Sequence, residues 1–204
     1  TFAQFSNCGV NCHVVSGSVS DVSGGLFLAG HVYMTNSTLT VPAGATLTIG
    51  AGAVVKFANI VEFVVDGTLI VNGTVGSPVV FTSIHDDVIA DHNGNGGASA
   101  LAGGQWLRMR FGAAADASVL NHLQVRGAGW NGNAAVQFNS CDSTATGLQV
   151  SQSNGPCVDL ANTSLPTFTS CAFDGGTIAA TGLSFAATGG FSGCTATGNS
   201  VYDA

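Results

Sequence analysis

The feature that most constrains this chain is an internal repeat with a step close to 23 residues. Four segments align, namely VLNHLQV (119–125), TATGLQV (144–150), TFTSCAF (167–173) and GFSGCTA (190–196). The fifth position of each is held by Leu123, Leu148, Cys171 and Cys194, at steps of 25, 23 and 23 residues. Repeats of this length are typical of arrays in which each unit packs against its neighbours.

Each repeat contains further short segments in which apolar and polar residues alternate. A second segment recurs at 135–138, 157–160 and 182–185. In the N-terminal half, Leu47 and Ile49 recur as Leu69 and Val71, Phe57 recurs as Phe81, and residues 39–41 recur as 63–65. Gly, Asn and Pro separate these segments, as turns do, and alternation indicates strands with one buried face. A period of 22–25 residues without helical stretches predicts an all-β, single-domain parallel β-helix (β-solenoid) of about 8–9 coils.

Two other repetitive or all-β architectures fit less well. Leucine-rich repeats share the period, but their Leu-x-x-Leu-x-Leu pattern is not sustained in this sequence. A β-sandwich would show irregular strand spacing and no recurring positions. We therefore expect the solenoid over residues 26–204, with a polar insertion at 84–105. Residues 1–25 are expected to form a separate strand or loop segment that contacts another subunit.

Composition excludes several classes of protein. Only 7% of the residues are charged, against about 25% in an ordinary soluble domain. Four basic residues against 11 acidic ones leave a net charge of −7, so a nucleic-acid partner is not expected. No apolar run approaches the roughly 18–20 residues of a membrane helix, so no membrane span is expected either. Sparse charge also weakens the repulsion that normally keeps copies of a protein apart.

The N-terminal coils resemble a known family. Residues 39–49, 54–57, 67–74 and 78–87 are similar to the opening coils of secreted bacterial right-handed parallel β-helix proteins, the pectate-lyase-like surface and adhesin family. The similarity extends through 104–106 and 119–122. It implies a right-handed coil and an extracellular protein, secreted or at the cell surface, but the fold alone does not determine the chemistry. A chain that opens at Thr1, without a signal peptide, also suits a processed secreted protein.

The cysteine content favours an oxidising compartment. The six residues are Cys8, Cys12, Cys141, Cys157, Cys171 and Cys194. An even number, with no CxxC pair and no closely spaced histidines, favours disulfides over zinc, with buried free thiols as the alternative. Stacked coil positions would place Cys171 beside Cys194. The predicted bonds are Cys8–Cys12, Cys141–Cys157 and Cys171–Cys194. Glycosylation sequons occur at Asn36, Asn72 and Asn162 and matter only if the source organism glycosylates.

The insertion carries a possible cation-binding pattern. Its Asp-x-Asn-x-Asn-Gly sequence at 91–96 matches the first half of a calcium loop, in which alternating oxygen ligands and a Gly turn surround a hard cation. Ala102 stands where such a loop has its Glu, so a nearby Asp must complete the ligand shell. The predicted calcium ligands are Asp86, Asp87, Asp91, Asn93 and Asn95. A metal-free solvated loop remains the main alternative, with transition-metal binding by the neighbouring histidines a further one, and no cofactor is required.

No catalytic residues are assigned. Glycosidases need two facing carboxylates, whereas the acids of the last coils are scattered, and the chain has no nucleophile elbow between a strand and a helix. Arg108 and Arg110 share one strand face and, together with Arg126, predict either a local ion-pair cluster or a substrate clamp. An enzyme acting on polysaccharides, a lyase or a hydrolase, is therefore only the third interpretation.

Two other functions remain. The leading interpretation is a secreted structural protein that self-assembles into an extracellular filament or sheath, because a solenoid has two open ends that invite another strand. The predicted intersubunit residues are Phe2, Phe5, Val201 and Tyr202. The alternative is a monomeric cell-surface adhesin or glycan-binding module, whose insertion frames a ligand groove.

Overall fold

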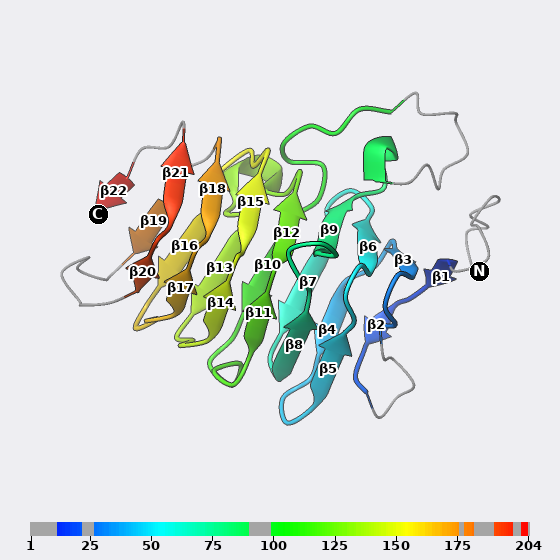
Figure 1. Ribbon diagram of the computed structural model, residues 1–204, viewed down its shortest axis with the longest axis horizontal. Helices are drawn as coiled ribbons and strands as arrows, with labels where there is room; N and C mark the ends of the chain where they lie inside the picture. The colour runs from blue at the N-terminus through cyan, green and yellow to red at the C-terminus, as the bar shows by residue number, and fades with distance from the viewer. Residues whose placement is uncertain are drawn as a thin grey trace.

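The computed structural model describes residues 12–21, 27–89, 99–175, 178–181, 190–197 and 201–203. In them the chain forms an all-β solenoid of about seven turns, with the coils stacked along the long axis (Figure 1). The predicted parallel β-solenoid is confirmed. The number of turns falls below the expected 8–9 because residues 84–105 span nearly one repeat and contribute only the short helix η1 (Asp87–Ile89) among the described positions.

Three parallel sheets form the walls, and each coil runs from sheet A to sheet B to sheet C. Sheet A contains β1 (Cys12–Val14), β3 (Val32–Thr35), β6 (Val54–Phe57), β9 (Val79–Ser83), β12 (Leu123–Arg126), β15 (Gln149–Ser151), β18 (Ala172–Asp174) and β21 (Thr195–Thr197). Sheet B contains β2 (Gly17–Ser18), β4 (Leu39–Val41), β7 (Glu62–Val65), β10 (Arg108–Phe111), β13 (Val136–Asn139), β16 (Val158–Ala161), β19 (Ile178–Thr181) and β22 (Val201–Asp203). Sheet C contains β5 (Thr46–Ile49), β8 (Thr68–Asn72), β11 (Val119–Asn121), β14 (Thr144–Thr146), β17 (Thr167–Thr169) and β20 (Phe191–Ser192). A second short helix, η2 (Trp130–Gly132), lies between β12 and β13.

Most of the predicted repeat positions stack as expected. One column of sheet A consists of Val125, Val150, Phe173 and Ala196. In sheet C, Leu47 pairs with Leu69 and Ile49 with Val71. The strand at 39–41 pairs with 63–65, and 136–138 with 158–160. The repeat found in the sequence is therefore the register of the sheets.

Two predicted equivalences are wrong. Phe81 pairs with Val55, whereas Phe57 pairs with Ser83. The coil between them includes an extra turn at residues 74–77, closed by two backbone hydrogen bonds, which lengthens this step. The place beside β16 that was predicted for 182–185 is occupied by β19, and 182–185 themselves lie outside the described residues.

Large aromatic side chains fill the space between the sheets. Phe57, Phe81, Phe138 and Phe168 are fully buried, as predicted, while Phe185 lies outside the described residues. The rings contact one another from coil to coil, for example Phe111 and Phe138 with centroids 4.8 Å apart. Burying each such side chain contributes about 1.5–3 kcal/mol. A continuous apolar column thus holds the coils together.

From β11 onward, the corner from sheet C to sheet A is made by single residues in the left-handed conformation. His122, Gly147, Ser170 and Gly193 stack at this corner with φ of 46°, 65°, 52° and 63°. Glycine adopts this conformation without strain, and other residues adopt it less often. At Gly147 a Cβ would lie 2.4 Å from His122 Nδ1, so the corner is tight as well as left-handed. One-residue corners keep the coils short and the period nearly constant.

The solenoid begins earlier than the sequence suggested. Strands β1 and β2 lie within residues 1–25, and they pair with β3 and β4 as the first strands of sheets A and B. The segment assigned to a separate element therefore includes part of the first coil. In the part of the chain that the structure describes, no helix has the length and apolar character needed to cross a membrane.

Candidate functional site

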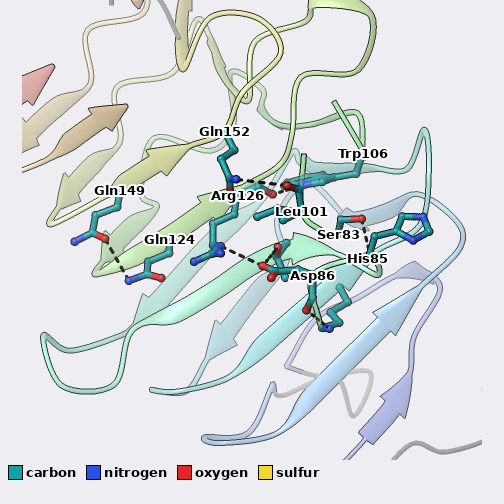
Figure 2. Close-up of polar contacts among 11 residues, drawn as sticks. Ser83, His85, Asp86, Leu101, Trp106, Gln124, Arg126, Gln149 and Gln152 are labelled. Carbon is teal, nitrogen blue, oxygen red and sulfur yellow. Dashed lines mark hydrogen bonds and ion pairs between the residues drawn. The ribbon is translucent and has the colours of Figure 1, made fainter. Parts of the chain in front are cut away.

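A buried polar cluster lies on the outer face of sheet A, where the insertion crosses it (Figure 2). Lys56 of β6 is the strand neighbour of Thr82 of β9. Arg126 follows Val125, the β12 partner of Phe81, and so extends the same column. Asp86, at the start of the insertion, folds back over this column. Residues from three neighbouring strands and one loop thereby meet at one place.

The carboxylate of Asp86 is the centre of the cluster. Thr82 Oγ1 donates a hydrogen bond to Asp86 Oδ2 over 2.6 Å. Arg126 Nε lies 3.1 Å from the same oxygen, an ion pair whose N–H is not aimed for a hydrogen bond. Lys56 Nζ donates to the backbone carbonyl of Asp86 over 2.8 Å. Asp86 thus engages a hydroxyl and a guanidinium through its carboxylate, and an ammonium through its backbone carbonyl.

Burial makes these contacts energetically important. Lys56, Thr82 and Asp86 are completely buried, and the Arg126 side chain is 25% exposed. Removing a charged group from water costs several kcal/mol, which must be offset by partners inside the protein. The insertion supplies the acid and the sheet supplies the cations. The cluster therefore fastens the insertion to the outer wall of the solenoid.

Further contacts hold the two ends of the insertion. Asp87 Oδ2 accepts a hydrogen bond of 2.7 Å from the backbone N–H of Ser99, which closes the neck of the loop. Trp106 is fully buried and stacks on Phe57 with centroids 4.3 Å apart. Its Nε1 donates to the carbonyl of Arg126 over 2.8 Å. The loop thus leaves and rejoins the wall at defined points.

Sheet A is more open next to the insertion. There Gln124 Nε2 of β12 donates to Gln149 Oε1 of β15 over 3.2 Å, and Gln149 is exposed (Figure 2). Gln152 Nε2 reaches the carbonyl of Leu101 at 3.5 Å, so the returning part of the insertion borders this strip. An amide row beside a guanidinium can donate and accept hydrogen bonds with the hydroxyl groups of a ligand.

The structure separates the predicted calcium ligands it describes. Asp86 points into sheet A, where Thr82 and Arg126 occupy its Oδ2, and Asp87 is engaged at the neck of the loop. The other three predicted ligands, at positions 91, 93 and 95, lie outside the described residues. Among the positions searched, which exclude those three, no three His, Cys, Asp or Glu side chains gather as a metal site. Calcium binding stays a prediction.

The predicted bond Cys141–Cys157 is absent, because both residues are buried free thiols. Cys141 lies two residues after the end of β13, and Cys157 directly precedes β16. The two residues therefore lie at opposite ends of the strands of sheet B, and no shared coil position brings them together. Burial raises the pKa of the Cys141 thiol. These cysteines are core residues rather than a crosslink.

Cys171 and Cys194 do stack on neighbouring coils, as the repeat predicts, but in the structure both are free thiols. The backbone N–H of Cys171 points to Cys194 Sγ at 3.4 Å. Burial raises the pKa of Cys171 to about 11, with the nearby Cys194 a smaller cause in the same direction. Cys8 lies outside the described residues, so the Cys8–Cys12 bond stays a prediction.

The arginines do not form one patch. Arg108 Nε lies 2.8 Å and Arg110 Nε 3.4 Å from Glu62 Oε1, on the outer face of sheet B. Arg126 lies on sheet A and pairs with Asp86. The predicted three-arginine patch is therefore wrong, because the residues belong to two walls. The contacts of these arginines match local ion pairing, one of the two predicted roles.

The predicted intersubunit residues are only partly described. Phe2 and Phe5 lie outside the described residues. Val201 and Tyr202 belong to β22, the last strand of sheet B, which pairs with β19. Sequence reasoning missed Lys56 and Thr82 as members of the sheet A cluster. The one available signal was a lysine in the otherwise apolar strand VVKF (54–57), where a buried ammonium requires a partner.

Comparison of the chain with known protein families, with curated proteins and with solved structures finds no match. The resemblance to secreted pectate-lyase-like proteins is thus supported by the β-helix fold alone.

Proposed function

We propose that this chain is a secreted structural protein whose solenoids join end to end into an extracellular filament. The observation that carries the proposal is the pairing at the ends of sheets A and B. Within the described residues, β1 and β2 pair only with β3 and β4, and β21 and β22 pair only with β18 and β19. An edge strand of this kind is a template for another chain.

The two ends fit each other because all strands run parallel. The last coil of one molecule presents the edge that the first coil of the next molecule would extend, with the same strand direction. Such a head-to-tail contact between different surfaces does not close on itself and generates a filament. Main-chain hydrogen bonds would supply the affinity, as in other cases of strand addition.

The core column also reaches the C-terminal end. Phe191 stacks on Phe168 with centroids 4.8 Å apart and is only partly buried. Ala196 occupies the column of the buried Phe173 but is itself exposed. An incoming coil would cover this apolar surface, so strand addition and apolar burial act together.

The free edge of β21 allows end-to-end assembly to be tested with a single substitution. Thr195 donates its backbone N–H to the carbonyl of Cys171 over 2.8 Å, so the N–H of Ala196 points to the free edge. Ala196→Pro removes an edge donor without removing an internal hydrogen bond. We expect the unmodified protein to form filaments in electron micrographs and Ala196→Pro to stay monomeric with a similar unfolding temperature. Ala196→Val, which keeps the N–H, should assemble. An unmodified protein that stays monomeric at high concentration in light scattering contradicts the proposal.

The amide row of sheet A favours a second candidate, a glycan-binding module. Gln124, Gln149 and Arg126 form a polar strip beside the insertion, where hydrogen-bonding groups converge. A glycan array tests this function with the unmodified protein, with and without calcium. Binding lost in Gln149→Ala and retained in Thr167→Ala, a change on another sheet, would support the second candidate.

A further inference from the structure

The outward side chains of sheet C form a surface that we call the C face. Its residues are Thr46, Thr48, Thr68, Ile70, Asn72, Val119, Asn121, Thr144, Thr146, Thr167, Thr169 and Ser192. All twelve are at least partly exposed, and none is charged. The strands are joined by continuous parallel pairing from β5 to β20. The C face is therefore a flat strip of hydroxyl, amide and aliphatic groups.

Ten of these twelve residues form two columns, and Thr46 pairs with Thr68 beside them. One contains only β-branched residues, in the order Thr48, Ile70, Val119, Thr144 and Thr167. The other contains Asn72, Asn121, Thr146, Thr169 and Ser192. β-Branched side chains have a restricted χ1 angle, so the first column presents a stiff surface. Short side chains stacked at the strand spacing are suited to packing of one sheet on another.

Charge distinguishes the C face from the other two walls. The outer face of sheet A holds Lys56 and Arg126, and that of sheet B holds Glu62, Arg108 and Arg110. At the rim of sheet C, Asp21 has both oxygens occupied by Thr48, through its N–H and its hydroxyl, at 2.7 Å each. With a net charge of −7, copies of this chain repel each other. The repulsion is weakest where neither surface carries a charge.

We propose that the C face is the lateral contact between two filaments of this protein, with the occupant a second copy of the same face. The inference rests on the proposed end-to-end assembly, because the area of one C face is small. Six strands of two to five residues cover about 300–450 Å² at the usual strand spacings. Two faces thus bury under about 900 Å², against about 1,200–2,000 Å² for a stable complex.

End-to-end assembly removes this limit. Each added subunit extends the strip, and every contact after the first forms at the high local concentration that the filament imposes. Lateral pairing is therefore expected only for filaments, and single solenoids should not dimerise through this face. Electron microscopy of the unmodified protein is expected to show filaments two solenoids wide.

The test adds charge to the C face. Thr146 and Thr169 are exposed neighbours in one column, so Thr146→Lys with Thr169→Lys places two like charges in the contact. The matched control, Gln124→Lys with Gln149→Lys, adds the same charge to neighbouring positions on sheet A. We expect the C-face variant to form filaments of half the width and the control to form paired ones. High salt, which screens the added charges, should restore pairing.

Each other outcome has a defined meaning. Paired filaments of the C-face variant at low salt overturn the inference and leave the proposed function intact. The same holds if the unmodified filaments are single, including the case in which they bind a neutral polysaccharide such as microcrystalline cellulose through the C face. If the unmodified protein forms no filaments, both proposals fail.

Discussion

The outer faces of sheets A and C belong to the same coils and differ in almost every physical property. On sheet A, the insertion covers a fully buried lysine and aspartate, and both sides of β9 are buried. On sheet C, the outward side chains are at least partly exposed and uncharged. The inward columns of both sheets are alike, because they build one core. In this solenoid the inward residues determine the fold, and differences in function must arise from the outward ones.

The largest loss in free energy of unfolding is expected when the acid of the sheet A cluster is removed. Asp86→Ala leaves the guanidinium of Arg126 without its counter-charge and the hydroxyl of Thr82 without its acceptor, and breaking a buried ion pair in this way costs about 3–5 kcal/mol. Urea unfolding measures the loss. A loss below 1 kcal/mol would show that the cluster does not hold the insertion.

A double variant separates charge from packing in that cluster. Arg126→Met combined with Asp86→Asn replaces the guanidinium by an apolar chain and the carboxylate by an amide. Replacing a buried ion pair as a whole is often close to neutral, so most of the stability lost in the single variants should return. Additive losses would contradict the coupling between the two residues.

A substitution at the corner that joins sheet C to sheet A is expected to cause an intermediate loss of stability. Gly147→Ala places a Cβ against His122 in a left-handed conformation, and we expect a loss of about 1–3 kcal/mol in free energy of unfolding. Gly193 is the matched control, because it is also left-handed but its Cβ would lie 3.6 Å from the nearest atom, Ser170 Oγ. A smaller loss for Gly193→Ala is expected, and equal losses would contradict the importance of the close approach.

The smallest change in stability is predicted for a substitution on sheet C. The same substitution, threonine to valine, is expected to cost more on sheet A. Thr167→Val changes an exposed C-face residue and should alter stability by less than about 0.5 kcal/mol. Thr82→Val removes the hydroxyl that donates to Asp86 and should cost about 1–3 kcal/mol. Thermal unfolding of the two variants, measured side by side, would contradict the comparison if the losses were equal.

The repeat allowed the inward columns to be predicted, because stacked coils must place similar apolar residues at one position. It failed where a coil departs from the mean length. The extra turn at 74–77 pairs Phe81 with Val55, and after a short step β19 takes the position beside β16 that was predicted for 182–185.

The site was harder to predict than the fold. Alternation places Lys56 on the outward side of its strand, but the predicted match of Phe57 with Phe81 would set it beside Val80 instead of Thr82. Periodicity also does not say which loop folds back over this side. The carbonyl that Lys56 binds belongs to Asp86, 30 residues away, in a segment outside the repeat. For the same reason, Asp86 looked like a member of an acidic loop, whereas its contacts lie on the sheet.

The single-residue corners have a practical consequence for engineering. A coil that turns from sheet C to sheet A within one residue has no room for added sequence there, so an insertion must lie in another connection. The connection from sheet A to sheet B after β9 already accommodates the 22-residue insertion 84–105, while β12 and β10 keep their register with the preceding coils. Equivalent connections after β15 and β18 are therefore suitable positions for displaying foreign peptides at a regular spacing along the rod.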